Sequence, residues 1–531
     1  MKANNMNNLF DLIDSADVVS FDMFDTLILR PFVKPQDVFG YLEKATGIIG
    51  FAKNRIESEK KARILKMAKY KQEDCTIGDI YELMDSQYQW LQDKEVTFEK
   101  QIAIINKKAY SFYQYALKQN KKIIITTDTY LPKNIIEKIL LNNNIKIYDE
   151  IFISSQIGIS KASGNLFSHI ISKYNIDSSK ILHIGDNHIA DIKNANQKGL
   201  KTYYLKPPAL EFFNSQENKY LIPFLEKYNG NPIVSAILGL RILNYNQESN
   251  FWVNLGFNYG GILAIEMTLN AIKISEEKKM SDLFFIARDS FLPKEIFNLF
   301  NNNPKLKGHY ITLNRVIKYK YKQTIKNDSN ELYKYLNAIK TNGNNVGIVD
   351  TSAGTFSAQD ILQDYLPNLN FCGIYLHTRE NDKYMFKNLS NLSIDEVKKI
   401  FDLNFIEILL TSLEPKIEDL KDCKPIYEQN ENIHETTKRK FYQNILKGER
   451  LFVNLFKRFF IDFLYPEQIN IIYEYIGNYW NNLSDLDRQY LSQIKNSVDT
   501  QQTMYVSLID SKQDIASQLS KREREREKRS S

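Results

Sequence analysis

The chain has 531 residues, of which 43% are hydrophobic and 25% are charged, and its formal net charge is +6. This length is too great for a single hydrophobic core, so we expect two or three domains of ordinary size. The composition is that of a soluble globular protein, and a charge this small over this length argues against a nucleic-acid partner, which usually requires a concentrated basic face.

The three cysteines, Cys75, Cys372 and Cys423, are too far apart in the sequence to form a zinc motif. Three isolated thiols favour a reducing compartment. The first residues of the chain contain no apolar signal segment, and no apolar run approaches the roughly 18 residues of a membrane span. We therefore expect a cytoplasmic protein without a transmembrane segment.

Short apolar segments alternate with helical stretches from residue 18 to about residue 205. This alternation predicts an α/β domain over residues 1–205, built on a Rossmann-like parallel sheet. A long stretch with helical spacing, about residues 33–118, follows the first strand, and we expect it to form a helical cap. The predicted strands are residues 18–22, 122–127, 150–154, 181–185 and 201–205.

The sequence after residue 205 predicts four further regions. We expect a linker and helix at residues 206–245, a second α/β domain at residues 246–389 and a helical region at residues 390–510. The tail, residues 511–531, mixes charges of both signs without apolar anchors, and we expect it to be disordered.

Two polar loops follow predicted strands of the second domain, ARDS at residues 287–290 and DTSAGTF at residues 350–356. A small-residue loop between a strand and a helix can bind an anion, and Gly354 would let the backbone approach a phosphate. The alternative is that Gly354 only makes a tight turn.

Four polar features of the first domain lie at the carboxyl ends of predicted strands, where parallel sheets bind ligands. Asp22 could attack phosphorus and form an aspartyl-phosphate. A hard cation such as Mg2+, held by Asp22 and Asp186 with Asp191 completing or orienting its ligands, would cancel the repulsion between nucleophile and phosphate. The Thr127 hydroxyl and the Lys161 ammonium would hold phosphate oxygens. Each residue alone has a structural alternative, as a helix cap, a solvated charge or a turn residue.

The segments that carry these residues resemble the four motifs of the haloacid dehalogenase superfamily of hydrolases, in the branch with a helical, C1-type cap after the first strand. They are FDMFDTL, ITTDTYLP, SKASGNLF and HIGDNHIAD. The resemblance covers about residues 16–206. It implies an Mg2+-dependent phosphohydrolase that acts on a small phosphorylated substrate, with Asp22 as the nucleophile and Thr26 as the family's threonine.

The first motif departs from the family's pattern at Phe24. Phosphatases of this superfamily usually carry an Asp there, which protonates the leaving oxygen and later activates water, and a phenyl ring can do neither. The superfamily's dehalogenases also lack this acid, but they lack the full set of metal carboxylates as well. Asp186 and Asp191 therefore favour phosphate chemistry. The backbone carbonyl of Phe24 could still bind the metal, and Asp25 either replaces the missing acid or caps the turn.

Three other polar residues near these motifs each have two interpretations. His188 is either a second candidate acid or a surface histidine of the loop. His183 lies within a predicted strand, which favours a core residue with satisfied hydrogen bonds. Arg30 either meets an anionic substrate or pairs with an acidic residue of the cap.

The layout of the whole chain resembles large predicted hydrolases found in bacterial surface-polysaccharide gene clusters. This resemblance implies a sugar phosphate of surface-glycan synthesis as the substrate and glycan-synthesis proteins as partners. Two alternatives remain open. The first domain is either a catalytically weakened module for binding or scaffolding, or a phosphoryl or phospho-glycosyl transferase in which an acceptor hydroxyl replaces water.

Overall fold

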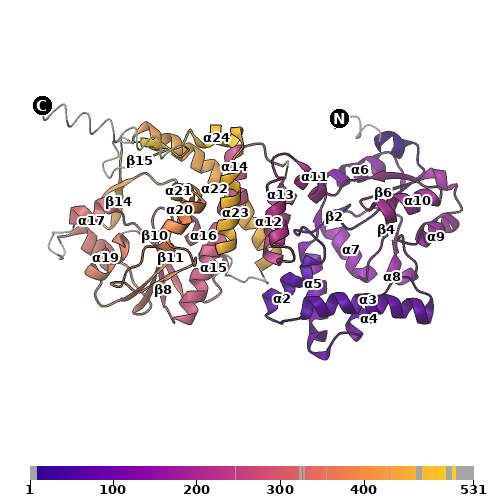
Figure 1. Ribbon diagram of the computed structural model, residues 1–531, viewed down its shortest axis with the longest axis horizontal. Coiled ribbons are helices and arrows are strands. Elements are labelled where there is room, and N and C mark those ends of the chain that lie inside the picture. The colour runs from indigo at the N-terminus through magenta and orange to yellow at the C-terminus, as the bar shows by residue number, and fades with distance from the viewer. Residues whose placement is uncertain are drawn as a thin grey trace. The chain divides into compact units, whose positions relative to one another are not determined.

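The structure is a computed structural model that describes residues 9–245, 247–321, 326, 329–353, 356–429, 431–461, 469–497 and 505–509. The charged tail and Gly354 lie outside the described residues. The chain forms two compact units. The first comprises Met1–Tyr245 and Arg458–Leu464, and the second comprises Asn246–Lys457 and Tyr465–Ser531 (Figure 1).

The first unit is built on a five-stranded sheet in the order β5-β4-β1-β6-β7, in which every neighbouring pair is parallel. The predicted Rossmann-like parallel sheet is therefore confirmed. All four residues of β1 are buried, as expected for a central strand with helices on both faces. The strands are β1 (Val18–Phe21), β4 (Lys122–Thr127), β5 (Glu150–Ile153), β6 (Ile181–Gly185) and β7 (Lys201–Tyr204).

The two faces of this sheet are covered by different helices, because successive side chains of a strand point to opposite faces. Val18 of β1 packs in one cluster with apolar residues of α9. Phe21 of the same strand makes an edge-to-face ring contact with Tyr113 of α6. The helices and helical turns of this sheet domain are α6 (Lys107–Lys118), α7 (Lys133–Asn142), α8 (Ser154–Ile157), α9 (Asn165–Tyr174), η2 (Ser178–Lys180), η3 (His188–Lys193) and α10 (Asn194–Gln197).

A helical insert follows β1, and a short antiparallel pair closes it. Strand β2 (Ile28–Leu29) pairs with β3 (Ile104–Ile105), so both ends of the insert are held at one place. The next helix, α6, packs against β4, so the insert ends before the position near residue 118 that the sequence indicated. The insert consists of α2 (Asp37–Thr46), α3 (Phe51–Tyr70), α4 (Ile77–Glu82), η1 (Ser86–Leu91) and α5 (Gln92–Ile102).

A buried ion pair lies at the centre of the insert. Arg55 is fully buried and donates two hydrogen bonds of 2.8 Å to the Glu95 carboxylate, which also accepts one from the Tyr81 hydroxyl. Breaking such a pair on one side is strongly destabilising, because it leaves a buried charge without a partner.

Residues 206–245, where a linker and helix were expected, form three helices within the first unit. The longest packs against α2 and is apolar and buried along nearly its whole length. A β-carbon at Gly239 would lie 2.2 Å from the backbone carbon of Pro31, so only glycine fits at this contact. The helices are α11 (Pro208–Asn214), α12 (Leu221–Lys227) and α13 (Pro232–Asn244).

The second unit contains another five-stranded parallel sheet, in the order β12-β11-β10-β8-β9, which confirms the second predicted α/β domain. Its strands are β8 (Asp282–Ile286), β9 (Lys307–Ile311), β10 (Asn345–Ala353), β11 (Asn370–Thr378) and β12 (Phe386–Asn388). The helices between them are α16 (Phe291–Phe300), α17 (Arg315–Tyr321), α18 (Glu331–Asn337) and α19 (Ser357–Tyr365).

Helices from both ends of the second unit complete it. They are α14 (Phe251–Leu255), η4 (Gly256–Gly260), α15 (Gly261–Glu277), α20 (Ile394–Ile400), α21 (Leu403–Leu410), α22 (Ile433–Phe460, whose last residues belong to the first unit), α23 (Ile469–Asn481) and α24 (Asp485–Leu491). The region expected to be helical also contains two hairpins that the sequence did not indicate. These pair β13 (Ile417–Lys421) with β14 (Lys424–Tyr427), and β15 (Lys495–Ser497) with β16 (Tyr505–Ser507). In the part of the chain that the structure describes, every helix is too short or too polar to cross a membrane.

Candidate active site

Asp22 stands at the carboxyl end of β1, the middle strand of the first sheet. Its backbone nitrogen donates a 2.9 Å hydrogen bond to the carbonyl of Ile184 in the neighbouring strand β6. The residue is only 6% exposed. The sheet therefore fixes the backbone of Asp22 and leaves its carboxylate at the edge where ligands bind in parallel sheets.

Three carboxylates meet at this edge. One oxygen from each of Asp22, Asp186 and Asp191 lies within 4.8 Å of the other two. Asp186 directly follows β6, and Asp191 lies one helical turn further on, in η3. Carboxylate oxygens are the ligands that Mg2+ prefers, so this donor set fits a hard divalent cation.

The loop between the last two carboxylates is held by its own hydrogen bonds. The backbone nitrogen of Asn187 donates to Oδ2 of Asp191 at 2.9 Å. The Asn187 side chain in turn accepts hydrogen bonds from the backbone nitrogens of Ile189 and Ala190. These two bonds cap the first turn of η3. The loop thus turns Asp191 back toward Asp186.

Lys161 lies among these carboxylates and is 3% exposed. Its ammonium donates to Oδ1 of Asp22 at 2.5 Å and to Oδ1 of Asp191 at 2.6 Å. Burial alone would lower the pKa of Lys161, but the two carboxylates outweigh it and raise the pKa well above its usual value. The lysine therefore stays charged and can attract an anion to this edge.

The backbone of Lys161 is fixed by a residue whose role the sequence did not indicate. The Asp128 carboxylate, just after β4, accepts from the backbone nitrogen of Lys161 at 2.9 Å and from that of Ala162 at 3.2 Å. From the other side, the Asn194 side chain donates to the carbonyls of both residues. A loop held in this way presents the ammonium in one position.

The carboxylates of the site differ in their proton affinity. Burial raises the pKa of Asp22 well above its ordinary value, although Lys161 opposes it. Burial also raises the pKa of Asp186 to about 6, with Asp25 and Asp191 adding to the shift. For Asp191 burial acts in the same direction, but Lys161 and His183 outweigh it and hold its pKa well below the usual range. Asp186 therefore binds a proton more readily than an exposed carboxyl does, whereas Asp191 binds one less readily.

His183 orients Asp191 from within the sheet. It is fully buried in β6, with Nε2 3.1 Å from Oδ1 of Asp191 and Nδ1 2.8 Å from the Ser20 hydroxyl. Burial lowers its pKa, so the imidazole is neutral. Because a carboxylate only accepts hydrogen bonds, we assign the proton to Nε2, and Ser20 then donates to Nδ1.

Phe24 and Asp25 occupy a tight turn after the nucleophile. Asp25 has a left-handed backbone (φ 60°), and its nitrogen donates to the Ile28 carbonyl at 2.7 Å. Its carboxylate lies 3.9 Å from Nη1 of Arg30, whose guanidinium carbon stands 4.1 Å from the centre of the Phe24 ring. Arg30 also donates to Glu99 of the insert at 2.9 Å. The Asp25 carboxylate lies outside the cluster formed by those of Asp22, Asp186 and Asp191.

Other residues predicted for this site have different surroundings. The Thr26 hydroxyl donates to Oδ1 of Asp186 at 3.1 Å. Thr127 is buried at the end of β4. His188 is exposed and its ring stacks on Tyr204, with centroids 3.7 Å apart. The roles of Thr127 and of the Phe24 carbonyl stay predictions.

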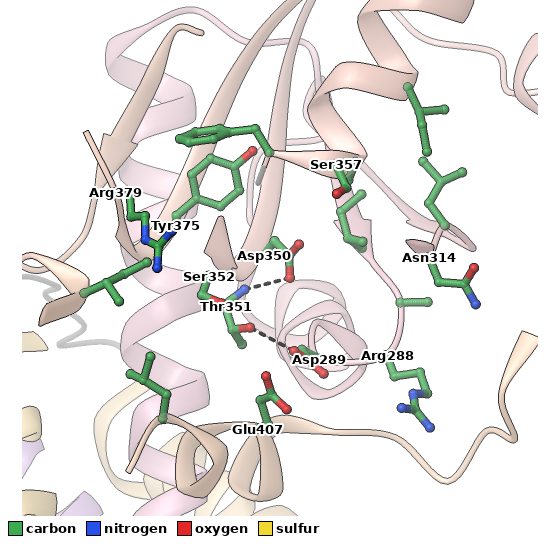
Figure 2. A pocket seen from close by; sticks show the side chains of 18 of the residues that line it. Arg288, Asp289, Asn314, Asp350, Thr351, Ser352, Ser357, Tyr375, Arg379 and Glu407 are labelled. Carbon is green, nitrogen blue, oxygen red and sulfur yellow. Dashed lines mark hydrogen bonds between the residues drawn. The ribbon is translucent and has the colours of Figure 1, made fainter. Parts of the chain in front are cut away.

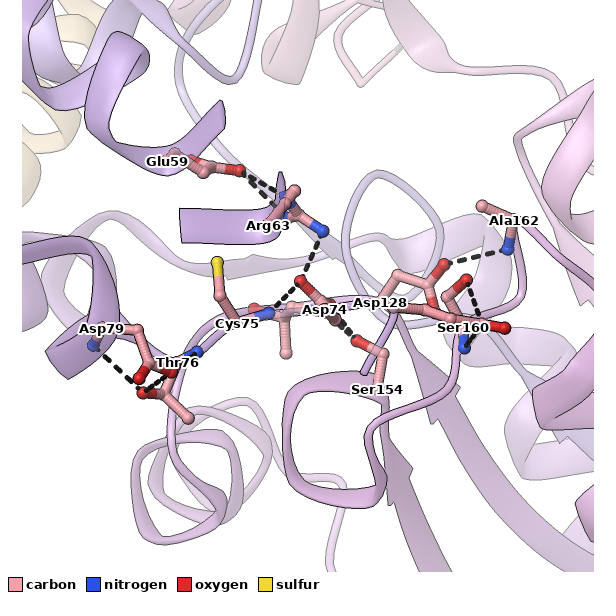
Figure 3. Close-up of polar contacts among 12 residues, drawn as sticks. Glu59, Arg63, Asp74, Cys75, Thr76, Asp79, Asp128, Ser154, Ser160 and Ala162 are labelled. Carbon is pink, nitrogen blue, oxygen red and sulfur yellow. Dashed lines mark hydrogen bonds and ion pairs between the residues drawn. The ribbon is translucent and has the colours of Figure 1, made fainter. Parts of the chain in front are cut away.

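The insert contacts the sheet domain through the loop between α3 and α4. Asp74 pairs with Arg63 of the insert and accepts from the Ser154 hydroxyl of the sheet domain (Figure 3). Its neighbour Glu73 accepts from the backbone nitrogen of Ser160 at 2.7 Å and from the Ser163 hydroxyl at 2.6 Å. These serines flank Lys161, so the insert holds the loop that carries the site's cation.

Residues 16–197 match the family model of haloacid dehalogenase-like hydrolases, which spans under half of the chain. No curated protein matches the chain. With the parallel sheet and the clustered carboxylates, this match identifies residues 16–197 as a haloacid dehalogenase-like hydrolase domain.

Several solved structures are similar to the chain. An L-2-haloacid dehalogenase from Xanthobacter autotrophicus shares 13% identity over 42% of this chain and 88% of its own, with a TM-score of 0.30. A putative hydrolase of the same superfamily from Bacillus subtilis, solved bound to magnesium, shares 18% over 36% and 86%, with a TM-score of 0.27. An enzyme of the superfamily from Bacteroides thetaiotaomicron shares 15% over 36% and 95%, with a TM-score of 0.28.

Proposed function

We propose that the first unit is an Mg2+-dependent phosphohydrolase that acts on a small phosphorylated metabolite through an aspartyl-phosphate. The observation that carries this proposal is the cluster of Asp22, Asp186 and Asp191, with one oxygen of each within 4.8 Å of the others, and the buried ammonium of Lys161 bound to Asp22 and Asp191. The three carboxylates would hold the metal, which when bound would offset the negative charge of nucleophile and phosphate.

The residues of the chain would divide the reaction between them. An oxygen of Asp22 attacks phosphorus, and the bond from phosphorus to the ester oxygen breaks. Lys161 and Thr127 hold the phosphoryl oxygens as charge spreads over them. Water then attacks the phosphorus of the aspartyl-phosphate, which releases phosphate and restores the Asp22 carboxylate. His183 keeps Asp191 in place throughout.

Protonation of the leaving oxygen is the step for which the site has no clustered acid. Phe24 cannot donate a proton, and the Asp25 carboxylate faces Arg30. We propose that solvent protonates the leaving group, or that Asp25 does so after it separates from Arg30. Hydrolysis should then be slow for poor leaving groups such as alkoxides.

A sugar phosphate of surface-glycan synthesis is the substrate class that we propose. The layout of the chain, a hydrolase domain followed by a second α/β unit, supports this proposal through its resemblance to hydrolases of polysaccharide clusters. Arg30, next to the site and bound to the insert through Glu99, would lie at the substrate side of the turn.

The test is a steady-state assay of phosphate release from a panel of sugar phosphates and from p-nitrophenyl phosphate, with and without Mg2+. We expect Mg2+-dependent turnover that Asp22→Asn abolishes and that the matched exposed control, Asp93→Asn, leaves unchanged. Absence of turnover by the unsubstituted protein, or equal activity in Asp22→Asn, would contradict the proposal.

A second candidate function follows from the acid that is missing at Phe24. If the leaving group cannot be protonated and turnover is prevented, the first unit serves as a binding or scaffolding module in polysaccharide assembly. The Phe24 ring is covered by the Arg30 guanidinium, which supports a structural role for this position. A transferase is separated from both by its product, because it would place phosphate on an acceptor and release none.

A further inference from the structure

A cavity of about 520 Å³ lies in the second unit, at the carboxyl ends of β8 and β10 (Figure 2). These strands are neighbours in the sheet, but the chain leaves β8 for β9 on one side and continues from β10 to β11 on the other. The cavity thus occupies the point where the strand order reverses, which is the usual ligand site of an open parallel sheet. Its volume falls within the range of small-molecule sites.

Two carboxylates form the floor of this cavity. Asp289 follows β8 and accepts a 2.8 Å hydrogen bond from the Thr351 hydroxyl. Asp350 lies in β10 and accepts one, also of 2.8 Å, from the backbone nitrogen of Thr351. Burial raises the pKa of both carboxyls, and the charge of Asp289 adds to the shift at Asp350. Thr351 therefore holds the two acidic groups side by side.

Cationic side chains lie around this floor, and the charge of Arg288 opposes the effect of burial on the pKa of Asp289 without outweighing it. Arg288 and Arg379 line the cavity from different sides of the two carboxylates in Figure 2. Among the residues that the structure describes, neither guanidinium forms an ion pair with Asp289 or Asp350. A third cation, Lys398, also lines the cavity but pairs with Asp395 at 3.4 Å. Charged groups such as Arg288, Asp289 and Asp350, which gather at one cavity without direct pairing to one another, are costly unless a ligand completes their contacts.

One wall of the cavity is aromatic. Tyr375 is 1% exposed, and its hydroxyl donates to the Gln359 side chain at 3.0 Å, which fixes the ring. Phe356 packs edge-to-face against it, with ring centroids 5.7 Å apart. The cavity therefore combines hydrogen-bond acceptors and guanidinium donors with a wall that buried aromatic rings hold in place.

We propose that this cavity binds a small phosphorylated polyol, such as a sugar phosphate. Carboxyl oxygens of Asp289 and Asp350 accept hydrogen bonds from the ligand's hydroxyl groups. Because Arg288 and Arg379 lie on different sides of these carboxyls, one of the two guanidinium groups binds the phosphate, for which its fork is suited. Tyr375 supports the cavity wall from behind. This binding site is separate from the hydrolase domain and does not depend on the function proposed for it.

The test is isothermal titration calorimetry of the full chain carrying Asp22→Asn, in EDTA, with glucose 1-phosphate, fructose 6-phosphate and ribose 5-phosphate as probes. We expect at least one probe to bind with a Kd of about 1 mM or tighter, and both glucose and inorganic phosphate to bind at least about tenfold more weakly. Binding of none of the three at this strength would overturn the proposal.

Variants assign the binding to this cavity. Asp350→Asn should weaken binding about tenfold or more, and so should one of Arg288→Gln and Arg379→Gln, since each removes a charged side chain that contacts the ligand. Arg450→Gln is the matched control, because Arg450 of the same unit pairs with Glu295 and does not line the cavity. Circular dichroism shows that each variant is folded. Binding that persists in all three cavity variants but is lost in Lys161→Gln belongs to the hydrolase domain and overturns the proposal.

Discussion

Phe24 and Arg30 together decide which chemistry the turn after the nucleophile supports. The guanidinium stands 4.1 Å from the ring centre, close enough for a cation–π contact, and it also binds Glu99 and lies near Asp25. An acid at position 24 would stand where the ring now stands, next to the Arg30 guanidinium. The missing acid is thus replaced by a structural contact between the turn and the insert.

Restoring an acid at this position should raise the rate for poor leaving groups. Phe24→Asp is expected to increase kcat for glucose 1-phosphate by about 10- to 100-fold, toward the usual contribution of a positioned general acid. It should change kcat for p-nitrophenyl phosphate much less, because that leaving group needs no proton. Phe24→Leu is the matched control without an acid. A Phe24→Asp variant no faster than Phe24→Leu on the sugar phosphate would contradict this account.

The proton affinity of Asp186 predicts how Mg2+ stabilises the protein at different pH values. Its pKa is raised to about 6 in the metal-free fold, from an ordinary value of 3.8. The stability that this carboxyl contributes without metal is therefore fully present below about pH 4 and is lost as pH rises through about 6. Metal binding requires the ionised form and must compete with the proton at low pH.

We therefore expect saturating Mg2+ to raise the thermal unfolding midpoint clearly at about pH 7.5 and much less at about pH 5. Asp186→Asn should remove most of the difference between the two conditions. Differential scanning calorimetry with and without the metal measures this. An equal shift at both pH values would show that Asp186 does not hold the ion.

The clustered residues of the site could be predicted from the sequence, because a parallel sheet brings the carboxyl ends of its strands to one edge. Asp22, Lys161, Asp186 and Asp191 meet there in the structure. The direction of the Asp25 side chain could not be predicted, since it depends on a left-handed backbone and on Arg30. No local signal marked the residues that hold the loops, such as Asp128 and Glu73.

At the scale of elements, the insert and the Lys161 loop act together. Glu73 binds Ser160, Ser163 and Asn165 of that loop and belongs to a segment outside the sheet domain. The four hydrogen bonds that the Glu73 carboxylate accepts fix the loop in addition to those that Asp128 accepts. The insert can therefore influence where the Lys161 ammonium stands without touching the substrate at this point.

Glu73→Ala should lower kcat/KM for a phosphate ester about tenfold, because a small displacement of a group that holds phosphate is costly in rate. Glu73→Gln, which keeps an acceptor oxygen, should recover part of the loss, and Glu57→Ala on the exposed face of α3 should have no effect. Phosphate-release kinetics measure all three. Equal rates for Glu73→Ala and the unsubstituted protein would show that the loop is held without the insert.

The strands of the two parallel sheets were predictable except for the short, partly exposed edge strand β12, whereas the hairpins were not. Parallel strands are short, apolar and buried, and turn residues bound them. The hairpin of β13 and β14 turns at Asp422 and Cys423, both with left-handed backbones (φ 50° and 60°). Such a turn is usually marked by Asn-Gly or Asp-Gly, and a cysteine at its second position gives no sequence signal.

At the scale of the whole chain, the second unit joins segments almost two hundred residues apart. The backbone of α22 crosses that of α14 and η4 so closely that a β-carbon at Gly448 would lie 1.9 Å from the Val253 carbonyl oxygen. A β-carbon at Gly256 would lie 2.0 Å from the Ile445 carbonyl oxygen. No periodicity in the sequence indicates such a crossing, because it depends on which glycines of two distant helices face each other.

Gly448→Ala tests this crossing, because alanine stabilises an exposed helix position but destabilises a position where its methyl group meets the backbone of another helix. In an exposed helix, replacing glycine with alanine stabilises by roughly 1 kcal/mol, because alanine has the higher helix propensity. At the crossing the added methyl group meets backbone, which cannot rotate away, and overpacking of this kind costs about 1–3 kcal/mol or more. The net effect should be destabilising, with a thermal midpoint lowered by roughly 2–8 °C for a unit of this size.

Gln443→Ala, at an exposed position of the same helix, should leave the midpoint nearly unchanged. If Gly448→Ala is instead as stable as the unsubstituted protein, the two helices do not cross at the distance described.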